Sequence, residues 1–385
     1  MKKSQKIAIG VASAVTAAAT GTAIAKKNQA KKQERSVKSL VLEDASKLLP
    51  LSVKKNVNFE KSLEQSSKPY SIPSQVRRAL HLEELDEFED TFVYEPKEKT
   101  TEDVIFYIHG SDFWNAPTRF HYSFIKKLSN KLGAEVIFPV YPKAPAHSAV
   151  DIQKMLLDRY AYLIEEKGIP ADKIIFAGDA AGGGIALSLI QKIKYQTMPM
   201  PREAFLISPW LDVTNSNPEI DEIQPYDTIL NAESLRDKGE QYAGDLELTH
   251  PAVSPIYGDL TGLCKITVFA GTREIFCADV NKLKDIADEF DLDIDVNIFK
   301  NQMHFFVGLP IPEAETAFAI MASEIYGIEE VEEDGEENGE ETAENTDEAA
   351  AQEDGEAAET EEPAEEVVVE EVEIVEPETE EKPQE

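Results

Sequence analysis

The sequence of 385 residues has only two cysteines, Cys264 and Cys277. Two thiols in a chain of this length cannot form a disulfide framework, which excludes a small disulfide-rich scaffold. Neither cysteine stands at a spacing typical of metal ligands, so we interpret both as ordinary thiols. We therefore expect no metal site, and we also expect no cofactor.

The C-terminal residues 328–385 lack aromatic side chains and almost lack positive charge, with 28 acidic residues and one Lys. Such a segment cannot bury enough apolar surface to offset the entropy lost on ordering, so we expect a disordered acidic tail. Its run "EEVVVEEVEIVEPE" alternates apolar and acidic residues and could pair as a strand with a partner. The charge excludes nucleic acid as a partner and suits cations or a basic protein surface.

A long, strongly apolar run is also missing. The best candidate is "IAIGVASAVTAAATGTAIA", the nineteen uncharged residues 7–25, which is rich in Ala, Gly and Thr. Residues 1–38 carry nine basic residues and one acid. Because the basic residues crowd the downstream side, we expect a single membrane anchor with the body in the cytoplasm. The alternative is a secretory signal, with Ala23 and Ala25 before the cleavage point.

Between these ends, residues 39–327 alternate short apolar runs with amphipathic ones. The predicted strands are "DVIFYI", "AEVIFPVY", "KIIFA", "EAFLISP", "KITVFAG" and "DIDVNIF", and helix patterns stand between them. This alternation predicts an α/β fold, a mainly parallel sheet covered by helices on both faces. Two stretches, about 39–89 and 215–263, fall outside the alternation and are predicted to form a helical cap.

The stretch "IIFAGDAAGGGIALSLI", residues 174–190, predicts a strand, a sharp Gly-rich turn and a helix. The tip of the turn is Ala180. In parallel sheets the ligand site forms beyond the carboxyl ends of the strands, which is where this turn lies.

Six further stretches complete a pattern. They are, in chain order, "FYIHGSDFWNAP", "PVYPKAP", "ISPWLDVTNSNPEI", "HPAVSPIYGDLTGL", "GTREIF" and "MHFFVGLPIPEA". Together with "AGDAAGGG" they resemble the hormone-sensitive-lipase-like branch of the α/β-hydrolases, a carboxylesterase family with an HGGG box and a GDSAGG turn. The resemblance covers roughly residues 70–327 and implies the α/β-hydrolase fold.

The resemblance implies an ester hydrolase in which a Ser attacks the ester carbonyl, a His takes its proton and a carboxylate orients the His. Here the nucleophile position is Ala180, whose methyl group cannot form an acyl-enzyme. His304 matches the family histidine, and Glu274 matches the acid, which is more often Asp. Asp279 is an alternative acid, more typical of a surface or helix-capping residue. Ser111 is the one other hydroxyl that we consider as a nucleophile.

The family's oxyanion box also departs from the pattern, because His109 and Gly110 are followed by Ser111 and Asp112. The resemblance places the oxyanion donors at the backbone N–H groups of Ser111, Asp112 and Ala181. We expect His109 to support the loop. The Asp112 carboxylate would lie near developing negative charge, and two unit charges about 4 Å apart repel by roughly 4 kcal/mol at an effective dielectric of about 20.

Three hypotheses follow. The chain is a pseudoenzyme that holds a small acyl or ester ligand and serves as a binding or scaffold module. It is an active esterase whose nucleophilic Ser has been replaced by Ala, so that Ala180 is not the native residue. It is an enzyme of other chemistry, in which His304 and Glu274 act as a general base.

Overall fold

The structure is a computed structural model and describes residues 24–47, 59–86 and 88–327. Two predicted segments fall outside this description. They are most of the predicted anchor, residues 7–25, and the whole predicted acidic tail, residues 328–385. The disorder of the tail and its binding of cations or a basic protein therefore stay predictions.

The body is built on one eight-stranded sheet in the order β1-β2-β4-β3-β5-β6-β7-β8. The strands from β4 to β8 pair in parallel, while β2 pairs antiparallel with both β1 and β4. The family fold and the mainly parallel sheet are thus confirmed. The strands are β1 (Glu83–Leu85), β2 (Phe88–Tyr94), β3 (Val104–Ile108), β4 (Glu135–Pro139), β5 (Ile174–Asp179), β6 (Glu203–Ile207), β7 (Lys265–Gly271) and β8 (Ile294–Phe299).

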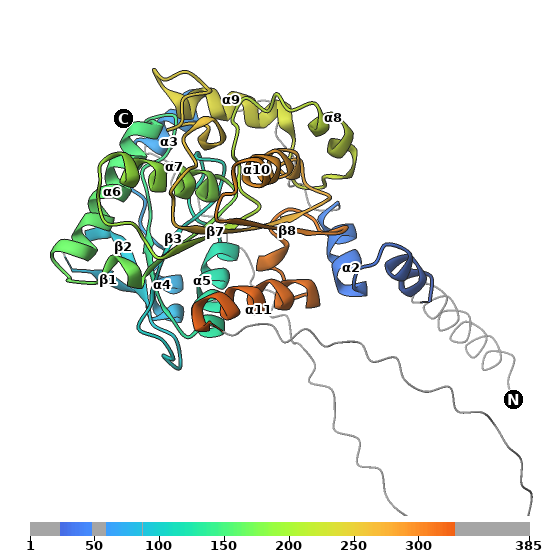
Figure 1. The fold of residues 1–385 in the computed structure, drawn as a ribbon, viewed down its shortest axis with the longest axis horizontal. Helices are drawn as coiled ribbons and strands as arrows, with labels where there is room; N and C mark the ends of the chain where they lie inside the picture. Colours follow the sequence, from blue (N-terminus) through green and yellow to red (C-terminus); the bar gives the residue numbers. More distant parts are fainter. Residues whose placement is uncertain (1–23, 48–58, 87, 328–385) are drawn as a thin grey trace, which may run out of the picture. The chain divides into compact units, whose positions relative to one another are not determined.

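Helices cover both faces of the sheet. The longer ones are α5 (Arg119–Leu132), α6 (Ala149–Glu165), α7 (Ala181–Tyr195), α10 (Cys277–Phe290) and α11 (Pro312–Tyr326). In Figure 1, α5 and α11 lie on one side of the strands, and α7 and α10 lie on the other. The remaining helices are α2 (Val37–Ser46), α3 (Phe59–Ser66), α4 (Ser74–Leu80), α8 (Glu219–Ile223) and α9 (Ala232–Ala243), and the 3-10 turns are η1 (Ala171–Lys173), η2 (Gln224–Tyr226), η3 (Pro255–Tyr257) and η4 (Phe306–Gly308).

The all-apolar central strands explain this layering. Along β3, Phe106 and Ile108 point into the core shared with α6, α7 and α10, whereas Ile105 and Tyr107 point into the core shared with α5 and α11. Successive side chains of a strand face opposite sides, so a strand buried on both faces must be apolar throughout.

The first predicted cap stretch, about residues 39–89, is wrong at its C-terminal end. There β1 and the start of β2 join the edge of the sheet instead. The pattern of "FEDTFVY" explains the difference, because Thr91, Phe92 and Tyr94 are buried while Glu89 is exposed. A half-buried antiparallel strand near the edge of a sheet tolerates such charged residues, whereas a central parallel strand does not.

The second predicted cap stretch, about 215–263, contains α8, α9 and η3 and connects β6 to β7. Figure 1 shows α9 at the top of the view beside α8, on the same side of the strands as α7 and α10. Asn231 caps α9, because its side chain accepts a hydrogen bond from the Ser234 N–H.

The predicted membrane anchor is not supported and is corrected here. Among the residues that the structure describes, no helix has the length and apolar character needed to cross a bilayer. Residues 24–32, at the end of the predicted span, are helical. This segment is polar from Lys26 onward and contacts the body, with an ion pair from Lys26 to Asp44.

Candidate functional site

The Gly-rich turn forms a strained elbow between β5 and α7. Ala180, at its tip, has φ 47° and ψ −118°. A non-Gly residue at positive φ costs on the order of 1–3 kcal/mol, so the surroundings must impose this conformation. The Ala180 N–H donates to the carbonyl of Ile207 at 2.9 Å, and its own carbonyl accepts from the Trp210 N–H at 2.8 Å. The elbow therefore has its sharp geometry without a nucleophile.

Two glycines allow the strand and helix to approach so closely. A Cβ on Gly178 would lie 2.5 Å from the Gly182 carbonyl oxygen. A Cβ on Gly182 would lie 2.0 Å from the carbonyl oxygen of Ile108 in β3. Both distances are far below van der Waals contact, so only glycine fits at either position.

Glu274 and His304 form a pair at the ends of neighbouring strands. Nδ1 of His304 lies 2.6 Å from Oε2 of Glu274. Oε1 of Glu274 accepts hydrogen bonds from the Gly271 N–H at 2.7 Å and from the Ser208 hydroxyl at 2.8 Å. The Ser208 oxygen in turn accepts from the Phe305 N–H at 3.1 Å. The carboxylate is fully buried and well satisfied, which fixes the orientation of the imidazole.

The charges around His304 set its protonation. Burial lowers the pKa of His304, but the hydrogen bond and charge of Glu274, with the charges of Asp227 and Asp179, outweigh burial and raise the pKa above its ordinary value. Asp227 is half-buried, and its partial loss of solvation raises the pKa of this carboxyl to about 6. The imidazole is thus held in a strongly anionic surrounding that favours the imidazolium.

The oxyanion loop follows β3 and has an unusual backbone. Ser111, Asp112 and Phe113 all have positive φ, at 85°, 54° and 63°. The family resemblance implies Gly at the position of Ser111 and Gly or Ala at the position of Asp112, so the loop has a glycine-like backbone despite its side chains. Within the described residues, the N–H groups of Ser111, Asp112 and Ala181 have no hydrogen-bond partner, which leaves them available as donors.

The Asp112 carboxylate is neutralised from the cap. The Lys238 ammonium of α9 forms an ion pair with Oδ2 of Asp112. Both oxygens also accept from the Asn115 side chain, at 2.8 and 3.1 Å. The repulsion expected from the sequence is therefore much reduced, because the carboxylate faces a cation 126 residues away in the chain.

Asp179 ties the elbow to the oxyanion loop. Its Oδ1 accepts from the Gly110 N–H at 2.9 Å and from the Tyr107 hydroxyl at 2.5 Å. Burial raises the pKa of Asp179, but the charge and hydrogen bond of His121, with these two donors, lower it below the ordinary value. Its carboxylate is fully engaged behind the elbow.

His109 has a structural position. Its ring stacks on Tyr141 with centroids 4.2 Å apart, and its Nδ1 lies 2.6 Å from the Gly110 carbonyl. Burial, together with the charge of His121, lowers the pKa of His109 to about 3. The neutral ring supports the loop.

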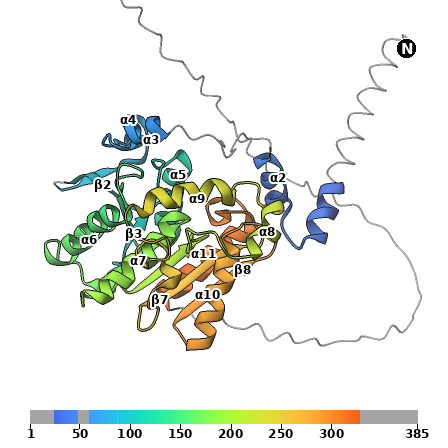
Figure 2. The same ribbon diagram turned by 90° about the horizontal axis from the view of Figure 1, so that it is seen from above.

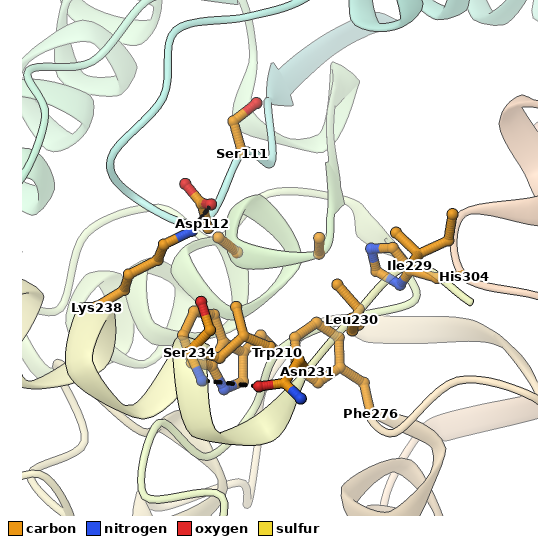
Figure 3. A pocket seen from close by; sticks show the side chains of 13 residues that line it. Ser111, Asp112, Trp210, Ile229, Leu230, Asn231, Ser234, Lys238, Phe276 and His304 are labelled. Atoms are coloured by element: carbon orange, nitrogen blue, oxygen red, sulfur yellow. Dashed lines mark hydrogen bonds and ion pairs between the residues drawn. The ribbon is translucent and has the colours of Figure 1, made fainter. Parts of the chain in front are cut away.

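Most of the predicted site residues meet in one cavity of about 210 Å³. Ser111, Asp112, Ala180, Ala181 and His304 all line it, and Glu274 stands behind His304. Its other walls come from the cap and from two aromatic side chains (Figure 3): Trp210, Ile229, Leu230, Asn231, Ser234, Leu235, Lys238 and Phe276. A larger cavity of about 660 Å³ beside α7 includes none of the predicted site residues.

Two predicted alternatives, Ser111 and Asp279, make no hydrogen bond with the Glu274–His304 pair in the described part of the chain. The Ser111 hydroxyl is buried and has no hydrogen-bond partner among the described residues, so no base is paired with it. In Figure 3 it lies across the cavity from Asn231 and Ser234. Asp279 is buried in the first turn of α10, where it accepts from Asn217 at 3.0 Å. It is neither a surface residue nor a partner of His304.

The sequence did not predict the groups that surround the Glu274–His304 pair or the cation that neutralises Asp112. Ser208, Asp227 and Lys238 lie far along the chain from the residues they contact, and no spacing signals those contacts. Only Ser208 carried a hint, because it directly follows the end of β6. Among the described residues no group of three or more His, Cys, Asp or Glu side chains could hold a metal ion.

Comparison with known proteins agrees with this geometry. Residues 105–308, more than half of the chain, match the family described as alpha/beta hydrolase fold, and the chain belongs to this family. It is 30% identical to an esterase of Acinetobacter venetianus over 222 residues, 57% of this chain and 73% of that protein. It is 29% identical to an acetyl-hydrolase of Streptomyces hygroscopicus over 48% of this chain and 61% of that protein.

The fold is also shared with a hormone-sensitive lipase from a metagenome library. The TM-score is 0.64 at 21% identity, over 75% of this chain and 97% of that one. Together these likenesses confirm the hormone-sensitive-lipase-like, carboxylesterase-related α/β-hydrolase fold that the motifs predicted.

Proposed function

We propose that this protein binds a small acyl or ester ligand in the cavity below the cap and does not hydrolyse it through an acyl-enzyme. The observation that carries the proposal is the methyl group of Ala180 at the elbow, in the same cavity as His304. Covalent ester hydrolysis needs a hydroxyl at this point, and the cavity offers none that is paired with a base.

The ligand class follows from the lining and from the relatives. An esterase and an acetyl-hydrolase are related to the chain, and their names refer to the hydrolysis of esters and of acetyl groups. A volume of about 210 Å³ suits a short acyl group rather than a long chain. The free N–H groups of the oxyanion loop and of Ala181 suit a carbonyl oxygen, and Trp210, Leu235 and Phe276 suit an apolar group.

The test compares the parent chain with Ala180→Ser on a panel of short-chain nitrophenyl esters. Loss of the triad Ser in a serine protease costs about 10⁶ in turnover, so restoring the hydroxyl beside an intact pair should raise turnover by at least about 10³. Ala180→Gly is the matched control, because it changes the same position without supplying an oxygen. Turnover by the parent at about 1 s⁻¹ or faster, an ordinary esterase rate, would overturn the proposal.

Binding is measured separately from turnover. Titration of the parent with a short-chain methyl ester should saturate and should perturb the His304 imidazole signal. Leu235→Trp, which fills the cavity from α9, should abolish saturation. Failure of the parent to saturate would remove the ligand-binding part of the proposal and leave the absence of turnover standing.

A second candidate is an enzyme in which the pair acts as a general base on water. The intact 2.6 Å contact between His304 and Glu274 favours it. The raised pKa of His304 works against it, because it lowers the fraction of neutral imidazole, the form that can accept a proton. Any activity of the parent should vanish in His304→Ala under this candidate and persist if the candidate is wrong. An active esterase seen as a Ser-to-Ala form instead predicts a Ser codon at position 180 of the gene.

A further inference from the structure

The N-terminal helix α2 contacts the loops that carry Glu274 and His304. Both ribbon views place α2 near α8 at the β8 side of the body (Figures 1 and 2). The helix is short, with a buried face formed by Ser39, Leu40, Glu43 and Ser46. Three of these four residues are polar, which is unusual for a face that serves only to cover a core.

Glu43 is the centre of this contact. It is fully buried, forms an ion pair with Arg35 and accepts from Nη2 of Arg273 at 2.8 Å. Burial raises the pKa of Glu43, but Arg35 and Arg273 lower it below the ordinary value, so the carboxylate is charged. Arg273 directly precedes Glu274 in the chain. In the described part of the chain, Glu43 is the one carboxylate that forms an ion pair with Arg273.

Residues 35–39, at the start of α2, also contact the loop that carries His304. The Ser39 hydroxyl donates to Oε1 of Gln302 at 2.7 Å, and Arg35 donates to the Asn301 carbonyl at 2.9 Å. Gln302 stands two residues before His304, and its carbonyl accepts from the Arg273 N–H at 3.0 Å. One buried network therefore joins α2 to both loops.

A third contact reaches the cap. The hydroxyls of Ser46 and Thr228 lie 2.7 Å apart. Next to Thr228, Asp227 accepts from the Ile275 N–H at 2.9 Å, and Ile275 follows Glu274. The loop that carries Glu274, which we call the acid loop, is thus held on both sides of Glu274. Arg273 contacts α2 on one side, and Ile275 contacts the cap on the other.

We propose that α2 is a positioning element of the site and that Glu43 is its positioning residue, which sets the geometry of the Glu274–His304 pair through Arg273. Glu43 contacts neither His304 nor the cavity. Its effect must pass through the acid loop. The charged groups that act directly on His304 are Glu274, Asp227 and Asp179. This inference concerns the pair itself and stands whether or not the cavity binds an ester.

The experiment measures the titration of His304 by NMR in the full chain and in Glu43→Gln. The protein has six histidines, so the His304 signal is identified as the one lost in His304→Gln. Because Glu274 raises the pKa of His304, a displaced acid loop should lower that pKa by at least about 0.5 unit, a threefold change in proton affinity. A purely structural role would lower the melting temperature and leave this titration unchanged.

Asp44→Asn is the matched control, since Asp44 is the next residue of α2 and is ion-paired with Lys26 and Lys47, of which Lys47 also pairs with Glu43. Its His304 titration should equal that of the parent. A folded Glu43→Gln with an unchanged titration, or an equal shift in Asp44→Asn, overturns the proposal. If Glu43→Gln does not fold, Ser39→Ala decides. It removes only the hydrogen bond to Gln302, and a smaller downward shift supports the proposal while no shift overturns it.

Discussion

The two sides of the cavity differ in what they retain. On one side, Glu274 and His304 keep their side chains, their contact and the donors that orient them. On the other side, the elbow keeps its backbone conformation, but Ala180 carries no oxygen. The difference shows that the shape of the elbow depends on glycines and neighbouring carbonyls, whereas the family's chemistry depends on one side-chain atom. The backbone geometry of the elbow therefore does not depend on a hydroxyl at position 180.

If glycines set the elbow, the largest loss of stability should come from Gly182→Ala. The added Cβ would meet the Ile108 carbonyl at 2.0 Å, so we expect the free energy of unfolding to fall by about 3 kcal/mol or more in urea denaturation. Gly262→Ala is the control for steric contact, because an added Cβ at Gly262 has nothing within 4 Å, and only its φ of 58° disfavours alanine. It should cost about 1 kcal/mol. Equal losses in the two variants would show that close approach at the elbow is not the constraint.

The second largest loss of stability is expected in Glu274→Gln, on the side of the cavity that holds the acid–histidine pair. Losing hydrogen bonds to a buried charge should lower the free energy of unfolding by about 2 kcal/mol at pH 6. Burial then acts on His304 without its counter-charge, so the pKa of His304 should fall below its ordinary value.

The sign of the pH dependence follows from linkage. A histidine whose pKa is raised on folding stabilises the protein below its unfolded pKa of about 6.5, and this stability is lost as pH rises through the folded pKa. The difference between parent and Glu274→Gln should therefore be larger at pH 6 than at pH 9. A difference that grows toward pH 9 would contradict the assignment.

Asp279 is a buried acid that, unlike Glu274, has one carboxylate oxygen without a hydrogen-bond partner among the described residues. Burial raises the pKa of Asp279 to about 6, and its Oδ2 has no partner among the described residues. Its charged form therefore destabilises the fold once pH exceeds that pKa. Asp279→Asn should raise the free energy of unfolding by about 1 kcal/mol at pH 8 and leave it nearly unchanged at pH 4. A loss at pH 8 would mean that the Asp279 carboxylate has an unrecognised cationic partner.

The smallest effect is expected at the elbow tip. Ala180→Gly relieves the positive φ of 47° and should raise the free energy of unfolding by about 0.5 kcal/mol. Chemical denaturation alongside Gly182→Ala measures it. A clear destabilisation would show that the Ala180 methyl contributes packing that its 7% exposure does not reveal.

The central fold was predictable because its signals are local. Strands buried on both faces read as continuous apolar runs, and β3 to β8 were found this way at nearly their observed bounds. The antiparallel strands β1 and β2 were missed, because exposed charges such as Glu83 and Glu89 hide the pattern of a half-buried strand.

The site was predictable only in part. Motif order identified Ala180, Glu274 and His304, because each follows a strand end in the family sequence. The ion pair of Asp112 with Lys238 and the network of Glu43 depend on tertiary contacts between distant segments. No spacing in the sequence indicates such contacts. The structure was needed to show that Lys238 neutralises the Asp112 carboxylate and that Glu43 contacts the loop of Glu274.

The most direct test of the missing nucleophile is the intact mass of the unaltered protein after incubation with p-nitrophenyl acetate, followed by peptide mapping. The account predicts no acetyl group on any hydroxyl that lines the cavity, while Ala180→Ser acquires one at position 180. An acetylated Ser111 or Ser234 in the unaltered protein would contradict it.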